Sequence, residues 1–327
     1  MAYHQFTQNE RVALMYLSQV GLSYREIGRR LKRSHSTIVR ELKRNGRAFG
    51  TYCCDAAHNQ AEARKKKPRH HIKQSNKPLC DYVENKLQED WSPETIAGRL
   101  QIDFPRNSTM RISPETVYQW VFNNAQQGGD WYQHLLRKHK ARRPHKPYGS
   151  LRGLIKDRVS IDERPLSINN RSRFGHWEGD SVLGRKGTGA IATHVERKSR
   201  YTVGAKLNDQ RADTFSMATQ KAFECIPEKW RKTLTVDNGK EFADFKTIEA
   251  TTSMKVYFCD PYSPWQRGTN ENTNGLLRHY FPKGINWQEV SEKALEIAID
   301  KLNNRPRKCL NYRTPREVFL KSIGGAV

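Results

Sequence analysis

The chain has 327 residues, with 58 Lys and Arg against 34 Asp and Glu, and a formal net charge of +24 at pH 7. This length suits two or three domains with their own cores, and the charge favours a polyanionic partner. No apolar run approaches the roughly 18 residues of a membrane-spanning helix, and the first ten residues lack the basic-then-apolar order of a secretory signal. We therefore expect a cytoplasmic protein.

The positive charge is concentrated in the first half of the chain. Residues 1–160 contain 30 basic and 14 acidic side chains, net +16, whereas the remainder contains 28 and 20, net +8. We expect the first half to provide most of the nucleic-acid binding.

The six cysteines are scattered, which favours reduced thiols over a disulfide framework. A zinc site is disfavoured because no pair of its candidate ligands has finger-like spacing. Those candidates are Cys53, Cys54, His58, His70, His71 and Cys80.

Residues 1–50 predict a helix-turn-helix domain. Thr7 with Glu10 forms a capping-box pattern ahead of an apolar stretch that Gly21 closes, and Ser23 with Glu26 repeats the pattern. A polar turn, KRSHS, leads to a third helix. Its inward positions are Ile38 and Leu42, and its outward positions are Thr37, Arg40, Glu41 and Arg44.

A tight turn between two short helices, the second with a basic free face, is typical of DNA recognition. The expected contacts to base edges are Ser36, Thr37 and Arg40. The expected contacts to phosphate are Arg29, Arg30, Lys43 and Arg44. The alternative is a three-helix bundle with a solvated basic face.

A basic connector and a second helical module follow. The connector RKKKPRHHIKQSNKP is polar and proline-flanked, typical of a solvated tether able to lie along DNA. The tetrapeptide SPET then occurs at residues 92–95 and 113–116, a strong helix-start signal each time. This module is either a second helix-turn-helix or a dimerisation or bridging unit. Its expected core positions are Ile96, Leu100, Val117 and Val121.

A basic, irregular segment after this module lacks helical or strand period and marks a domain boundary. The predicted division is a helix-turn-helix domain at residues 1–50, a basic connector at 51–78, a second helical module at 79–137, a basic linker at 138–172 and an α/β domain with C-terminal helices at 173–327.

The last domain alternates strand and helix patterns. HWEGDSVLG, IATHVER and YTVGAKL predict a three-strand meander, DTFSMATQKAFECI predicts a helix, and LTV and KVYF predict two more strands. Helices are also expected at residues 241–250 and from a start signal at residues 263–266. This order predicts a ribonuclease-H-like α/β fold, a mixed five-stranded sheet with flanking helices, preceded by all-α helix-turn-helix modules.

Three carboxylates on this skeleton can share metal ions. Asp180 lies in the first strand, Asp237 ends the fourth, and Glu271 lies on the last helix, with 33 residues between the second and third. If the first and fourth strands are neighbours, both aspartates converge on one edge of the sheet. The helix face of Glu271 also carries the expected DNA contacts Arg267, Asn274 and Arg278.

Oxygen ligands of this kind suit hard divalent cations, and three acids so close would repel one another without metal. We expect Asp180, Asp237 and Glu271 to be both catalytic residues and metal ligands for two Mg²⁺ ions, with Mn²⁺ as a substitute. Two ions roughly 3.5–4 Å apart can activate a water or a 3′-hydroxyl and stabilise the leaving oxygen of an in-line displacement.

Each acid alone has a simpler explanation as a cap or ion-pair partner. We expect Trp177 and Trp265 to be packing residues near the site and His176 to form a local hydrogen bond. The competing acids nearby are Glu178, Glu196, Glu241 and Asp260.

HWEGDSVLG, TVDNGKEF and PYSPWQRGTNENTNGLLRHYFPKG resemble the catalytic blocks of DDE transposases of the insertion-sequence-thirty family, relatives of the retroviral integrase catalytic core. Residues 6–46 are similar to that family's leading helix-turn-helix, and the SPET segment to its second helical module. The resemblance implies that Asp180, Asp237 and Glu271 are the catalytic triad, with Arg278 as an accessory DNA contact. It also implies binding to terminal inverted repeats, cleavage that frees 3′-hydroxyls, and strand transfer into double-stranded target DNA by a homo-oligomer, a dimer or larger on the DNA ends.

Two rival functions use part of the same features. A helix-turn-helix transcriptional regulator would explain the first half of the chain but leave three metal-competent acids without a role. A ribonuclease-H-like DNA nuclease without joining activity would use those acids but does not require two amino-terminal binding modules.

Overall fold

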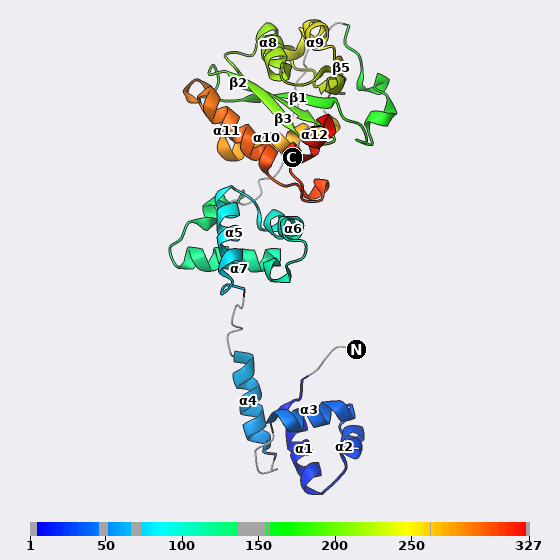
Figure 1. The fold of residues 1–327 in the computed structure, drawn as a ribbon, viewed down its shortest axis with the longest axis vertical. Coiled ribbons are helices and arrows are strands. Elements are labelled where there is room, and N and C mark those ends of the chain that lie inside the picture. The colour runs from blue at the N-terminus through cyan, green and yellow to red at the C-terminus, as the bar shows by residue number, and fades with distance from the viewer. Residues whose placement is uncertain are drawn as a thin grey trace. The chain divides into compact units, whose positions relative to one another are not determined.

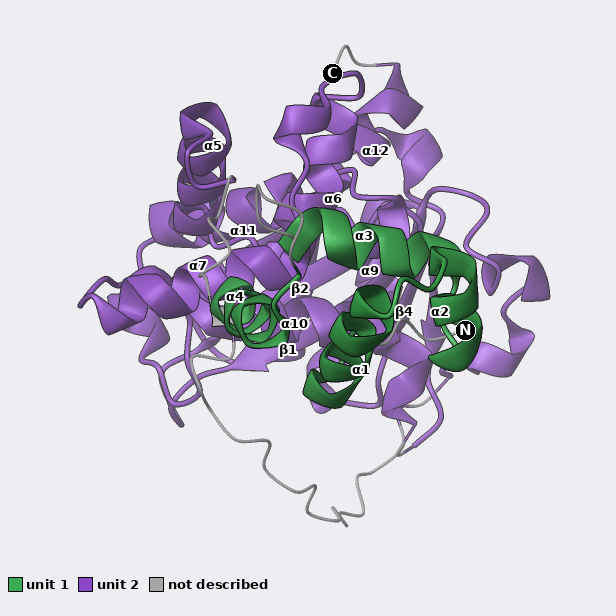
Figure 2. Ribbon diagram, turned by 90° about the horizontal axis from the view of Figure 1, so that it is seen from below, with its two compact units in different colours: residues 1–72 green, residues 73–327 purple. Residues whose placement is uncertain are grey.

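The computed structural model describes residues 5–45, 52–66, 73–136, 155, 157–261 and 263–324. The chain divides into two compact units, residues 1–72 and 73–327, which Figure 2 colours separately. Parts of several sequence predictions fall outside the described residues. They include residues 46–50 of the helix-turn-helix domain, residues 51 and 67–72 of the connector with His70 and His71 of the zinc set, and residues 138–154 and 156 of the linker. Among the helices that are described, none has the length and apolar character needed to cross a membrane.

The described part of the first unit contains α1 (Gln8–Gln19), α2 (Tyr24–Arg30), α3 (His35–Asn45) and α4 (Cys54–Lys66). Thr7 begins α1 with the expected capping box, because its hydroxyl accepts from the Glu10 N–H and the Glu10 carboxylate accepts from the Thr7 N–H. Ser23 caps α2. The core of the unit includes Leu14, Ile27 and Ile38, all fully buried.

The predicted outward position of Glu41 is wrong. Glu41 is buried, and its carboxylate pairs with the buried Arg11 of α1 at 2.7 Å. The Tyr52 hydroxyl donates to the same carboxylate at 3.2 Å. Helical periodicity could not reveal this, because the partner charge comes from another helix.

The predicted connector at residues 51–78 is also wrong in its first part. Its residues 54–66 form α4, which packs on α1 with Tyr52, Cys54 and Ala57 in the core of the first unit. Ala61 of α4 is also buried, and these few apolar residues are enough to dock a helix that is otherwise mostly polar.

The second unit begins with the helical module α5 (Lys77–Gln88), α6 (Pro93–Asp103) and α7 (Pro114–Gln126). Each SPET tetrapeptide starts a helix as predicted: Ser92 and Ser113 accept from the N–H groups of Thr95 and Thr116 at 3.3 and 3.1 Å. The four expected core positions, Ile96, Leu100, Val117 and Val121, are buried.

This module contacts the C-terminal helices of the same unit. The Arg99 guanidinium forms a bidentate pair with Glu317 at 2.7 and 2.6 Å. Asp90 accepts from Lys301 and is hydrogen-bonded to His134, both at 3.0 Å. The predicted linker also ends earlier than expected, since residues 160–168 already pack against the sheet, with Ile161 and Ile168 buried.

The sheet is five-stranded and mixed, as predicted. Its strands are β1 (His176–Leu183), β2 (Ala190–Glu196), β3 (Thr202–Leu207), β4 (Thr233–Val236) and β5 (Lys255–Phe258). The order is β3-β2-β1-β4-β5, with the β3, β2 and β1 meander antiparallel and β1, β4 and β5 parallel. β1 and β4 are therefore neighbours, which is the condition for the two aspartates to converge.

Helices cover both faces of this sheet (Figure 1). One face carries α8 (Ala212–Phe223) and α9 (Phe245–Thr252), and the other carries α10 (Gly268–Tyr280) and α11 (Glu292–Asn304). The last helix, α12 (Pro315–Ile323), packs on α11 and stacks Phe319 on Tyr201. The predicted helix at residues 241–250 is divided into a 3-10 turn at Lys240–Phe242 and α9.

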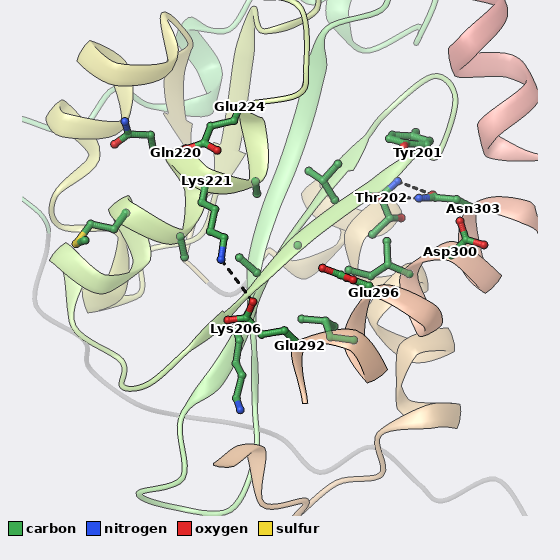
Figure 3. A pocket seen from close by; sticks show the side chains of 18 of the residues that line it. Tyr201, Thr202, Lys206, Gln220, Lys221, Glu224, Glu292, Glu296, Asp300 and Asn303 are labelled. Carbon is green, nitrogen blue, oxygen red and sulfur yellow. Dashed lines mark hydrogen bonds and ion pairs between the residues drawn. The ribbon is translucent and has the colours of Figure 1, made fainter. Parts of the chain in front are cut away.

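A groove of about 920 Å³ follows the edge strand β3 between α8 and α11 (Figure 3). Asn303 of α11 protects this edge, since its amide group bonds both the N–H and the carbonyl of Thr202 at 2.8 Å. Lys221 and Glu292 pair across the groove at 3.5 Å. None of the predicted site residues lines it, so the groove is separate from the acidic cluster.

Candidate active site

Asp180 lies in the middle of β1, on the sheet face that α10 covers. Alternation along the strand places it on the same face as Glu178 and Val182. Its Oδ1 accepts from the Ser181 N–H at 2.9 Å, and its Oδ2 accepts from the Asn274 side-chain amide of α10 at 2.9 Å. The orientation of this carboxylate is thus fixed by its own strand and by the helix above it.

Asp237 follows the last residue of β4, where that strand leaves the sheet. Its Oδ1 accepts from the Gly239 N–H at 2.8 Å, so the turn after β4 holds the side chain. Because β1 and β4 pair in parallel, with Trp177 opposite Leu234, the two aspartates reach the same region from adjacent strands.

The guanidinium of Arg267 joins the two aspartates. Its nitrogens lie 3.1 Å from Asp180 Oδ1 and 2.9 Å from Asp237 Oδ2, and it also donates to the Gly179 carbonyl at 2.8 Å. Burial alone would lower the pKa of Arg267, but the two carboxylates raise it above its ordinary value. Burial raises the pKa of Asp180, and the Arg267 charge opposes that shift. Both carboxylates therefore converge on one cationic group.

The third predicted ligand, Glu271, is not part of this cluster. It lies in the first turn of α10 and is exposed. The other residues predicted on its helix face do reach the sheet: Arg267 and Asn274 contact the aspartates, and Arg278 donates to the Leu183 carbonyl at 2.7 Å. In the described parts of the chain, no group of three or more Asp, Glu, His or Cys side chains is close enough to hold a metal ion.

The donor set fits a divalent cation. Two carboxylate oxygens, one from each aspartate, already face a shared positive group, and hard divalent ions prefer such ligands. Glu271 of α10 would have to turn towards the aspartates to add a third carboxylate. The structure thus brings together two of the three predicted ligands and leaves the third outside the cluster.

Glu178 has a structural role that sequence reasoning missed. It is fully buried, pairs with Arg197 at 3.0 Å, and accepts from the N–H groups of Thr269 and Asn270 at 2.9 and 3.0 Å. A carboxylate at a helix N-terminus satisfies unpaired N–H groups and interacts favourably with the helix dipole. Glu178 therefore anchors α10 on β1. Its sequence signal is an acid two residues before Asp180, on the same strand face.

The other competing acids have local partners. Glu196 accepts from the Ser199 N–H and hydroxyl, both at 2.6 Å. Glu241 accepts from the Ser181 hydroxyl at 2.8 Å. Asp260 accepts from the Gln266 side chain at 2.8 Å. Each carboxylate thus supports a turn or a strand end.

The local hydrogen bond predicted for His176 is confirmed, since its Nδ1 lies 2.9 Å from the Thr233 hydroxyl. Burial and the neighbouring Lys232 and Arg197 charges lower the pKa of His176 to about 4. Trp177 is fully buried in the core, as predicted. The packing prediction for Trp265 is wrong: the residue is 72% exposed, because it lies in the 3-10 turn before α10 rather than under that helix.

The predicted DNA contacts of the first unit lie on its surface. Ser36 and Arg40 of α3 are exposed, and Thr37 is half-buried with its hydroxyl 2.7 Å from that of Ser34. Arg29 and Arg30 pair with Glu26 but remain well exposed. Lys43 and Arg44 are also exposed.

Two parts of the chain match known protein families. Residues 2–45 match the family model described as a helix-turn-helix domain, and residues 170–264 match the integrase core domain. Together with the sheet order, these matches define a DNA-binding polynucleotidyl transferase with a ribonuclease-H-like catalytic domain.

Similarity to curated proteins extends over almost the whole chain. The sequence is 41% identical to the transposase InsI for insertion sequence element IS30A of Escherichia coli, over 98% of this chain and 85% of that protein. It is 38% identical to the transposase for IS1086 of Cupriavidus metallidurans, over 98% and 96%. It is 36% identical to the transposase for IS4351 of Bacteroides fragilis, over 97% and 96%. The chain belongs to the IS30 family of insertion-sequence transposases.

One solved structure, the catalytic core domain of BIV integrase, covers 46% of this chain and 97% of its own length, with 21% identity and a TM-score of 0.38.

Proposed function

We propose that Asp180, Asp237 and Glu271 form the DDE triad of this transposase and hold two Mg²⁺ ions, which Mn²⁺ can replace. The observation that carries this proposal is the convergence of Asp180 and Asp237 on one cationic group, with Glu271 in the first turn of the adjoining helix α10. When bound, the metal ions would activate the attacking hydroxyl or water and neutralise charge on the reacting phosphate.

The protein groups around the triad position it. Asn274 and the Ser181 N–H orient Asp180, and the Gly239 N–H orients Asp237. The amide of Asn274 is committed to Asp180, so we assign it a positioning role rather than the DNA contact expected from the sequence. Arg278 remains a proposed DNA contact, because it lies on the same helix face at the C-terminal end of β1.

We propose that the first unit binds the terminal inverted repeats. Base contacts are assigned to Ser36, Thr37 and Arg40, and phosphate contacts to Arg29, Arg30, Lys43 and Arg44. Their support is surface position on α2 and α3 of a helix-turn-helix unit. The proposed reaction cleaves the element end to free a 3′-hydroxyl and joins it to double-stranded target DNA. Because an element has two ends, a homo-oligomer with one site for each end is the proposed active form.

The test is incubation of the purified protein with Mg²⁺ and labelled DNA carrying the element end, together with unlabelled target DNA. The expected products are a nicked or cut end and a larger joined species. Cutting without any joined product would support the nuclease alternative. Sequence-specific binding without cutting would support the regulator alternative.

A further inference from the structure

Arg267 occupies the position that a divalent cation would need. Its guanidinium lies within 3.1 Å of Asp180 Oδ1 and 2.9 Å of Asp237 Oδ2, and its side chain is only 12% exposed. The other oxygen of each aspartate is bonded to Asn274 or to the Gly239 N–H, and Asp180 Oδ1 also accepts from the Ser181 N–H. The two oxygens that face Arg267 meet at one shared cationic group, so they are the pair that a single bridging metal ion would use.

A guanidinium and a metal ion that both bridge these two oxygens would occupy the same space. Mg²⁺ binds carboxylate oxygens at about 2.0–2.1 Å in near-octahedral geometry, so a bridging ion would lie where the guanidinium now lies, and the two positive charges would repel each other. Without either cation, two partly buried carboxylates this close would repel each other. A cation at this position therefore stabilises the folded protein, and Arg267 and a metal ion compete for it.

The local structure allows Arg267 to leave. It ends the 3-10 turn Pro264–Arg267, just before α10, and the preceding Trp265 is largely exposed. Open space surrounds the next residue, Gly268, where an added Cβ would meet nothing within 4 Å. The Arg267 Nε has no hydrogen-bond partner among the described residues, so the present position leaves one buried donor unsatisfied.

We propose that Arg267 is a resident counterion, which holds Asp180 and Asp237 together before metal binds and which the incoming divalent cation displaces. This inference rests on the proposed function, because it requires the two aspartates to be metal ligands. Arg267 is then a positioning residue in the metal-free protein, and its release makes a guanidinium free to meet the DNA phosphate.

The test measures Mn²⁺ binding to the full-length, DNA-free protein by isothermal titration calorimetry, and thermal unfolding in EDTA. Arg267→Gln removes the competing charge, so we expect Mn²⁺ to bind about tenfold more tightly, the size of effect that a close unit charge commonly exerts. The melting temperature in EDTA should fall, because the aspartates then repel, and Mn²⁺ should restore most of the loss.

The matched control is Arg278→Gln, which removes the same charge from the same helix face without touching either aspartate. A Mn²⁺ affinity of Arg267→Gln that equals the wild-type value, or changes no more than that of Arg278→Gln, would overturn the proposal. If Arg267→Gln does not fold, Arg267→Lys serves instead. A lysine ammonium lacks the planar fork of the guanidinium and is held less firmly between the two carboxylates, so we expect an intermediate gain in Mn²⁺ affinity. An unchanged affinity counts against the proposal.

Asp237→Asn separates this proposal from the proposed function. If Asp237→Asn binds Mn²⁺ as wild type does, the aspartates are not ligands and both ideas fail. If it loses Mn²⁺ binding while Arg267→Gln behaves as wild type, the proposed triad stands and the counterion role is wrong.

Discussion

The orientation and charge environment of individual residues in the catalytic domain depend on partners that are distant in sequence. Asp180 and Asp237 are oriented by different groups and share Arg267, which lies 30 positions beyond Asp237. Substitutions that keep shape but remove charge are therefore the most informative changes at this scale.

Asp237→Asn should abolish cleavage and strand transfer while leaving end binding unchanged. The variant keeps the side-chain volume and an acceptor for the Gly239 N–H but removes one proposed metal ligand, so we expect a rate loss of at least about 1000-fold. Single-turnover cleavage and a gel-shift assay on the same DNA measure the two effects. The control is Asp260→Asn, whose carboxylate bonds Gln266 and should be dispensable for chemistry. Strand transfer by Asp237→Asn at the wild-type rate would refute the assignment.

His194 should make the catalytic domain less stable in acid. The residue is fully buried beside Phe215 and Phe223, and burial lowers its pKa to about 3. Below about pH 6.5 this histidine binds a proton in the unfolded chain but not in the folded one. The free energy of unfolding therefore decreases as the pH falls from about 6.5 towards 3, by up to about 1.4 kcal/mol per pH unit. His176, with its pKa of about 4, contributes in the same direction.

His194→Leu should remove part of that loss. Leucine fits between the two phenylalanines, and the Thr219 hydroxyl keeps its bond to the Phe215 carbonyl. Urea unfolding at several pH values between 6.5 and 4 gives the slope of the free energy of unfolding against pH. In His194→Leu this slope should be smaller by the equivalent of about one bound proton. Between pH 7 and 9 the curves of the two proteins should be parallel. An equal acid loss in both would show that His194 is protonated in the folded state.

Single elements are held in place by groups that their own sequences do not contain. The helix α10 carries Glu271, Asn274 and Arg278, yet its first N–H groups are satisfied by Glu178 of β1. This bond sets both the position and the rotation of the helix over the sheet, and thereby determines which side chains meet Asp180.

Glu178→Gln should destabilise the second unit by about 2–4 kcal/mol, because it leaves the buried Arg197 without its counter charge and weakens the bonds to the α10 N-terminus. Urea denaturation followed by circular dichroism measures this loss, and the exposed Glu224→Gln is the matched control. We also expect the folded variant to cleave poorly. A stability equal to that of the control would mean that the ion pair is replaceable by neutral hydrogen bonds.

At the scale of the whole molecule, the two compact units separate two tasks. The first unit contains the helix-turn-helix match, and the second contains the integrase core. The structure extends the first unit beyond the predicted residues 1–50, because α4 supplies Cys54 and Ala57 to its core. A DNA-binding fragment must include this helix to be stable.

Residues 1–72 alone should bind the element end, with an affinity that falls steeply as salt rises. Each phosphate contact contributes about 0.9 to the slope of log K against log salt concentration. Lys43→Gln with Arg44→Gln should therefore reduce the slope by about two in a fluorescence-anisotropy titration, with Lys65→Gln on α4 as the control. A flat salt dependence of the wild-type fragment would contradict phosphate-based binding.

The sequence by itself determined the elements and the family. Alternating patterns and short apolar runs predicted all five strands, and the Ser-Pro-Glu-Thr signals predicted two helix starts. Three acidic blocks indicated the catalytic class. These signals could be read because each depends on residues close together in the chain. Contacts between distant residues were decided only by the tertiary structure. They include the pairing of Arg11 with Glu41, the docking of α4, the anchor role of Glu178 and the placement of Arg267 between two aspartates. A buried charge is stable only when it is paired with an opposite charge, and that partner can come from any part of the chain that the fold brings close. No local sequence pattern indicates which distant residue becomes the partner.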